Sequence, residues 1–199
     1  CQDVPGLLAR FVQERKSHVK SEPPRNLMPL SEVLTRMEKN IDERYYQGEQ
    51  GEYYCPENAN WMSYGWIGGL INTYPMLAKG DAEHLQRVKN TFDFALPRAK
   101  GKSGYYYDIL AANGEPMNRD AAAHYPGVGL TRRNGDVLYW MVKQFMLLKE
   151  QGRADAIDTA WESDVRKLAD AFVDTWKKEG TWGNYIHVET GDVAVYNTT

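Results

Sequence analysis

The sequence has few cysteines, no long apolar run and no excess of basic residues. Its two cysteines, Cys1 and Cys55, are too few to define a disulfide framework, and 199 residues can build a core without one. No segment is long and apolar enough to span a membrane. The formal net charge is −3, whereas a domain that binds nucleic acid usually presents a basic face. We therefore expect no membrane span and no nucleic-acid partner.

Familiar catalytic and ligand-binding motifs are also missing. The chain contains no phosphate-binding loop, no HExxH, no CxxC and no GxSxG. Its aspartates, among them Asp81 and Asp93, lack the spacing of a calcium-binding loop. Its four histidines are too scattered to define a metal site. The sequence thus predicts no cofactor and no metal.

The chain starts with Cys1 rather than with methionine. A leading cysteine is what remains after cleavage of a lipoprotein signal, since such segments are absent from mature chains. A cut within a longer polypeptide is the alternative explanation. On the first interpretation we expect an extracytoplasmic protein, which is periplasmic, secreted or a surface lipoprotein.

Hydrophobic periodicity predicts a mainly helical chain. Two segments, 60–78 and 136–148, are apolar on nearly every side, which is typical of buried helices. The proline-rich stretch 21–30 breaks helix and is expected to be a linker within a single domain, 1–199. Amphipathic helices, with apolar residues on one side only, are expected at four places: 4–19, 31–45, from Asp81 onward, and 154–178.

Two short segments look like β-hairpins that share one pattern. "GYYYDILAANGEP" (104–116) and "GNYIHVETGDV" (183–193) each contain a glycine, an apolar run rich in aromatics, and a turn of the type Asn-Gly-Glu or Thr-Gly-Asp. Each follows an amphipathic helix, and an all-apolar helix comes after the first of them. This order indicates an internal repeat. In such a repeat, all-apolar helices form an inner layer, amphipathic helices form an outer layer, and hairpins join each outer helix to the next inner one.

Four stretches carry a resemblance to a known architecture. They are "RRNGDVLYWMVKQFMLLKEQG" followed by "WKKEGTWGNYIHVETGDV", and a weaker copy, "NWMSYGWIGGLINTYPMLAKGD" followed by "KSGYYYDILAANGEP". Together they resemble the six-hairpin glycosidase superfamily, the (α/α)6 toroids, over most of 31–196. The resemblance implies a partial α/α toroid, about half a ring, as a fragment of a larger carbohydrate-active enzyme. The exposed apolar faces of a half ring would favour self-association or contact with the rest of the polypeptide.

The resemblance places ligands in a bowl at the start of the inner helices. Free backbone N–H groups and the positive end of the helix dipole face a ligand there. Two segments hold this position, 55–66 and 118–136. Glycoside hydrolysis normally uses two carboxyl groups, and Asp120 with Asp136, which we expect to begin an inner helix, are the preferred catalytic pair. His124 is the third catalytic candidate, because histidine can move protons at neutral pH.

Other residues of the same two segments are expected to bind substrate. Trp61 offers a flat ring on which a sugar can stack, and Arg132 offers a forked donor that suits a carboxylate. The remaining candidates lie near them in the sequence: Glu57, Tyr64, Tyr125 and Asn134. A structural role, such as core packing, helix capping or a surface ion pair, competes with each assignment.

Several functions are compatible with this scaffold. A glycoside hydrolase that acts on poly- or oligosaccharide in polysaccharide degradation is the first expectation, with its two carboxyl groups within about 10 Å of each other. A polysaccharide lyase would instead bring His124 or Tyr125, as base, together with Arg132 and Asn134, which would neutralise a uronate carboxylate. A sugar epimerase, or a non-catalytic helical module that binds a glycan or a protein, is also compatible, because fold alone does not choose among them. We expect the isolated chain to be inactive, since half a bowl does not position two catalytic groups tightly enough.

Overall fold

The computed structural model describes residues 3–18, 28–46, 53–54, 61–63, 69–111, 113–117 and 127–196. Contacts divide the chain into two units, Cys1–Met37 and Glu38–Thr199. The first unit holds helix α1 (Val4–His18) and the beginning of α2 (Leu30–Arg44). Both helices agree with the sequence prediction. Most of the expected linker, 21–30, lies outside the described residues.

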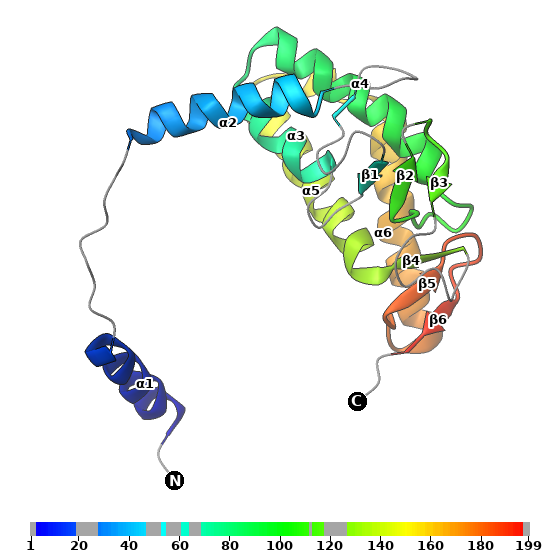
Figure 1. Ribbon diagram of the computed structural model, residues 1–199. Coiled ribbons are helices and arrows are strands. Elements are labelled where there is room, and N and C mark those ends of the chain that lie inside the picture. Colours follow the sequence, from blue (N-terminus) through cyan, green and yellow to red (C-terminus); the bar gives the residue numbers. More distant parts are fainter. Residues whose placement is uncertain are drawn as a thin grey trace. The chain divides into compact units, whose positions relative to one another are not determined.

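The second unit is mainly helical with short antiparallel strands, as the sequence predicted (Figure 1). Its helices after α2 are α3 (Gly69–Ala78), α4 (Ala82–Ala99), α5 (Thr131–Glu150) and α6 (Thr159–Glu179), with a 3-10 turn, Ala154–Ala156, between the last two. Its strands form one three-stranded sheet of β1 (Trp61–Ser63), β2 (Ile109–Ala111) and β3 (Pro116–Met117), and a second of β4 (Val128–Leu130), β5 (Tyr185–His187) and β6 (Val193–Val195). No helix among the described residues is long and apolar enough to cross a bilayer.

The same order of elements occurs twice in the second unit. A strand is followed by two helices and a hairpin, first as β1–α3–α4–β2–β3 and then as β4–α5–α6–β5–β6. In each copy the leading strand pairs with the first strand of the hairpin. The side chain of Gln144 in α5 donates to Leu70 O of α3 (3.0 Å), and that of Gln151 donates to Leu77 O (3.1 Å). The earlier glutamine thus meets the earlier leucine of α3, and the later glutamine meets the later leucine. Helices α3 and α5 therefore lie side by side and run in the same direction.

The two sheets lie where α4 and α6 end and where α5 begins, and we call this part of the unit the hairpin end. Ser103 Oγ, just after α4, donates to Val188 O of the second hairpin (2.6 Å). Thr131, the first residue of α5, donates its N–H to Asn184 O, just after α6 (3.0 Å). Each hairpin therefore follows one of the two helices α4 and α6, and the second hairpin lies beside the start of α5.

The core fills the space between α3, α4, α5 and α6. Phe92 of α4 meets the ring of Trp161 of α6 edge-on, with centroids 5.2 Å apart. Trp161 also donates its indole N–H to Asp93 (2.9 Å). Tyr53 stacks on Phe94 with centroids 3.8 Å apart. All four aromatic rings are buried, so they join the segment before α3 to both α4 and α6.

The prediction of one helix over 60–78 is wrong at its start. Trp61–Ser63 is strand β1, and the helix of this region begins at Gly69. The backbone of Trp61 pairs with Ala111 and that of Ser63 with Ile109. Strand β2 therefore satisfies hydrogen-bonding groups that a helix would have satisfied locally, and this long-range partner is invisible to a local pattern.

The prediction that 136–148 is buried on every side is also wrong. Val137, Met141 and their neighbours are buried, but the opposite side of α5 is exposed at three apolar residues: Tyr139, Val142 and Met146. Helices α3 and α6 pack against α5, and no described residue covers this remaining side. The apolar stripe predicted for α6 is likewise only partly buried, because Val173 and Trp176 are both exposed.

A substitution at Gly135 tests the start of α5. The helix starts at Thr131, before the predicted start at Asp136, so Gly135 lies inside it. A Cβ at this position would meet no atom within 4 Å. We expect Gly135→Ala to raise the free energy of unfolding by about 0.5–1 kcal/mol, because alanine loses less conformational freedom in a helix. Urea unfolding measures the change.

Gly104→Ala is the matched control. Gly104 has φ +96, and a Cβ there would lie 2.8 Å from Lys167 O. We expect this variant to be destabilised, because alanine is strained at positive φ and the contact is too close. A loss of stability in Gly135→Ala would contradict a helix that begins at Thr131.

Candidate functional site

The predicted site residues fall into three groups in the structure. Trp61 lies in β1, where the backbone is described but the side chain is not. Arg132, Asn134 and Asp136 lie in the first two turns of α5, at the hairpin end. The other candidates lie outside the described residues: Glu57, Tyr64, Asp120, His124 and Tyr125.

Asn134 holds the first hairpin against the start of α5. Its side chain is 1% exposed. Its Oδ1 accepts from Tyr106 N (2.7 Å), and its Nδ2 donates to Tyr106 O (3.1 Å) and to Leu130 O (3.3 Å). The amide group is thus fully engaged with main chain and has no exposed face to offer a substrate. Asn134 therefore holds main chain of the first hairpin and of β4 in place.

Asp108 and Arg133 add a second attachment at the same place. Both oxygens of Asp108 accept from Leu130 N, at 2.9 and 3.1 Å, and Arg133 Nη1 lies 3.4 Å from Asp108 Oδ2. Both side chains are largely buried. This carboxylate, which the sequence analysis did not single out, ties the first hairpin to β4 and α5. In the sequence, Asp108 is a single charged residue between three consecutive tyrosines and the apolar residues of β2, and this position could have marked it as a buried carboxylate.

Arg132 and Asp136 are the predicted residues that face solvent. Their side chains are 60% and 35% exposed, and Arg132 Nε lies 3.9 Å from Asp136 Oδ2. They are four residues apart on one helix, so they share a face. Asp136 lies in the second turn of α5, which corrects the expectation that it begins the helix. A guanidinium beside a carboxylate can bind sugar hydroxyl groups, and the carboxylate can accept a proton.

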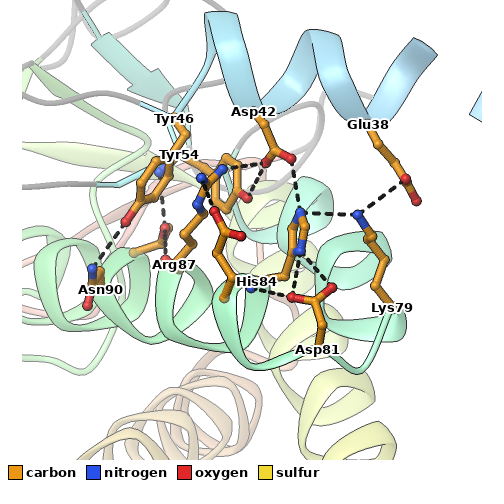
Figure 2. Close-up of polar contacts among 11 residues, drawn as sticks. Glu38, Asp42, Tyr46, Tyr54, Lys79, Asp81, His84, Arg87 and Asn90 are labelled. Carbon is orange, nitrogen blue, oxygen red and sulfur yellow. Dashed lines mark hydrogen bonds and ion pairs between the residues drawn. The ribbon is translucent and has the colours of Figure 1, made fainter. Parts of the chain in front are cut away.

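A second polar cluster lies at the opposite end of α4, where that helix begins (Figure 2). We call it the His84 cluster. Asp81 caps α4 through His84 N (2.8 Å) and also contacts His84 Nδ1 (2.8 Å). Asp42, from α2, contacts His84 Nε2 (3.0 Å), Arg87 Nη1 (2.9 Å) and the hydroxyl of Tyr54 (2.8 Å). The sequence analysis placed Asp81 at the start of an amphipathic helix and did not predict this cluster.

The charges of the His84 cluster stabilise its two carboxylates. Burial alone would raise the pKa of Asp42, but hydrogen bonds from His84 and Tyr54 and the positive charge of Arg87 outweigh burial and lower it. The pKa of Asp81 is lowered first by the hydrogen bond from His84 N. Burial and the neighbouring Asp42 raise the pKa of Tyr54 far above its ordinary value. The members engage one another, so the cluster is a joint between the end of α2 and the start of α4.

An open groove runs between loop 100–104 and α6. Its larger hollow has a volume of about 460 Å³. Lys102, Lys167 and Asp170, which line it, are exposed side chains. None of these residues lies in the two segments where the sequence analysis placed the site, 55–66 and 118–136.

Within the described ranges, no group of three or more His, Cys, Asp or Glu side chains could hold a metal ion. The chain matches no model of a known protein family and no curated protein sequence. Function is therefore inferred from the repeated architecture and from the exposed polar pair at the start of α5.

Proposed function

We propose that the second unit is part of an α/α toroid of the six-hairpin glycosidase type and binds an oligo- or polysaccharide at its hairpin end. The observation that carries the proposal is the duplicated strand–helix–helix–hairpin order, with α3 and α5 side by side and parallel. An α/α toroid needs this arrangement, because its inner helices all start at one rim and receive the chain from an outer helix.

The burial of the helices supports an inner and an outer layer. Helices α4 and α6 bury one side each, as outer helices should. Helix α5 leaves Tyr139, Val142 and Met146 exposed, on a side that an inner helix of a ring would present to the next one. The rest of a longer polypeptide, or a second copy of the chain, would then cover this apolar surface.

The start of α5 supplies chemistry suited to a carbohydrate. Arg132 is exposed there and Asp136 is partly exposed, and the positive end of the helix dipole favours electronegative ligand atoms. For hydrolysis Asp136 would be one of two carboxyl groups, and Asp120 remains our candidate for the second. For a lyase, Asn134 is not available to a uronate carboxylate, because its amide is bonded to the main chain of Tyr106 and Leu130, and Arg132 would be left as the neutralising group. We therefore favour a hydrolase scaffold over a lyase.

Affinity electrophoresis tests this proposal. Soluble xylan, mannan, hydroxyethylcellulose and polygalacturonate are the probes, and we expect at least one of them to retard the chain. Arg132→Ala and Asp136→Asn should each weaken that binding about tenfold, since loss of a charged hydrogen bond is worth about 1.5 kcal/mol. Release of reducing sugar, measured in parallel, is expected to be absent for the isolated chain.

Asp155→Asn is the control, because this exposed carboxylate lies in the 3-10 turn between α5 and α6. It should bind as the unsubstituted chain does. The proposal that this chain binds carbohydrate is wrong if none of the four polysaccharides retards the chain. The assignment to the start of α5 is wrong if a probe binds and neither substitution weakens it.

A further inference from the structure

An exposed aromatic pair lies at the end of α6. Trp176 is 49% exposed and Trp182, just after the helix, is 42% exposed. Their ring centroids are 4.5 Å apart, and the planes are tilted by 36°. At this centroid distance the two rings overlap face to face, and each leaves its outer surface as an apolar face of the kind on which the C–H face of a sugar stacks. We call Trp176 and Trp182 the tryptophan pair.

The position of Trp182 is fixed by the protein. Its indole N–H donates to Phe172 O (2.8 Å), and its ring meets the ring of Phe172 at a centroid distance of 6.4 Å. Phe172 in turn packs edge-on against the buried Tyr105. Gly180 and Gly183 both have positive φ, and a Cβ on Gly183 would lie 2.8 Å from Val195 O. A ring held in this way loses little freedom when a ligand binds.

Polar and charged groups lie near the tryptophan pair at the end of α6, where Glu179 is three residues after Trp176 on the same side of the helix. Tyr196, which is also exposed, donates its hydroxyl to Glu179 Oε2 (2.8 Å). Lys178 lies 3.3 Å from Glu179 Oε1 and also bonds Asp192. Apart from Val173, which is exposed one turn before Trp176, the residues next to the pair are carboxylates, an ammonium group and a phenol, whereas an apolar protein interface would be expected to continue further. A small apolar face with hydroxyl-binding groups at its edge fits a pyranose ring.

The tryptophan pair lies near the site proposed above. The hydroxyl of Thr131 donates to Trp182 O (3.4 Å), and Thr131 N donates to Asn184 O (3.0 Å). Thr131 is the first residue of α5 and directly precedes Arg132. A saccharide of a few units could therefore contact both places.

We propose that Trp176 and Trp182 form a stacking platform for one sugar ring of the oligo- or polysaccharide. This inference rests on the proposed function, because it assigns a further part of the same ligand to the tryptophan pair. The platform contributes apolar stacking, and the start of α5 contributes polar contacts.

Substitution of each tryptophan tests the platform with the same four polysaccharides. Trp176→Ala and Trp182→Ala should each weaken binding about tenfold, whereas the phenylalanine variants, which keep an aromatic face, should stay within about threefold. Val173→Ala, an exposed apolar control on the same helix, should bind as the unsubstituted chain does. Circular dichroism checks that each variant keeps its fold.

Tryptophan fluorescence gives an independent measurement. The bound polysaccharide should change the emission of the unsubstituted chain, and the double variant with phenylalanine at both positions should lose this change. The platform is wrong if the alanine variants are folded and bind fully while Arg132→Ala and Asp136→Asn bind weakly. The opposite result would support the platform and reject the site at α5. Self-association that Trp176→Ala abolishes, without an effect on polysaccharide binding, would instead make the pair a protein interface.

Discussion

Replacing Asn134 by alanine is expected to lower the free energy of unfolding by about 3 kcal/mol. The substitution removes an acceptor from Tyr106 N and a donor from Tyr106 O and Leu130 O. Asn134 and Tyr106 are both about 1% exposed, so water does not readily replace the lost bonds. Buried polar groups left without a partner carry the full cost of desolvation. Urea unfolding followed by circular dichroism measures the loss.

Asn113→Ala provides the matched control for Asn134→Ala. Asn113 is an exposed asparagine in the turn of the same hairpin, where its side chain accepts from Glu115 N (3.1 Å). Because water can replace this bond, we expect its loss to cost less than about 1 kcal/mol. Hydrogen exchange at the Tyr106 amide should accelerate in Asn134→Ala and stay unchanged in Asn113→Ala. A loss of less than about 1 kcal/mol in Asn134→Ala would contradict its role as the attachment of the hairpin.

Elements with local signals were predictable from the sequence. Asp81 accepts from His84 N and Asp158 accepts from Ala160 N, so α4 and α6 begin at side chains that a local pattern can recognise. The turn of the first hairpin has Gly114 at φ +83 next to Asn113, as its Asn-Gly pair indicates. The Asn-Gly turn indicated the hairpin, whereas hydrophobic periodicity located the two helices, and the helix expected at 154–178 begins only at Thr159, after the 3-10 turn Ala154–Ala156.

Elements that depend on distant partners were not predictable in the same way. Helix α5 starts at Thr131 because Asn184, far along the chain, accepts its N–H, and no side chain caps the helix. Strand β1 exists because β2 offers it an edge. In both cases tertiary contact overrides a local preference, which periodicity does not report.

In the candidate site, too, the positions along the chain were predictable, whereas the contacts with distant residues were not. The sequence placed Arg132, Asn134 and Asp136 near the start of an inner helix, and all three lie in the first two turns of α5. It did not distinguish Asn134 from the exposed pair, because the partner of Asn134 is the main chain of Tyr106. The amphipathic helix expected at 154–178 also placed Trp176 on its apolar, buried side, but near the end of α6 the buried side carries Ala171 and Thr175, and Trp176 is exposed.

The His84 cluster makes the joint between α2 and α4 sensitive to acid. Asp42→Asn should lower stability at pH 7 by about 2 kcal/mol, because hydrogen bonds from charged groups to a carboxylate are worth about 1.5–3 kcal/mol. Amide hydrogen exchange over the end of α2, 38–44, should accelerate. Glu43→Gln is the control on the same helix. Glu43 is exposed, and its 3.6 Å contact with Lys39 is a surface ion pair, which contributes little to stability.

The sign of the pH dependence follows from the lowered pKa values of Asp42 and Asp81. A carboxylate whose pKa is lower in the folded than in the unfolded state stabilises the fold above its unfolded pKa, about 3.9. This contribution is lost as the pH falls through the folded pKa. The difference in stability between the unsubstituted chain and Asp42→Asn should therefore be constant above about pH 5 and shrink steadily below about pH 4. Asp81 is present in both proteins, so part of the acid sensitivity should remain in Asp42→Asn. A difference that is the same at pH 6 and pH 3 would mean that the carboxylate of Asp42 carries no charge-dependent contact, and the joint would then depend on packing alone.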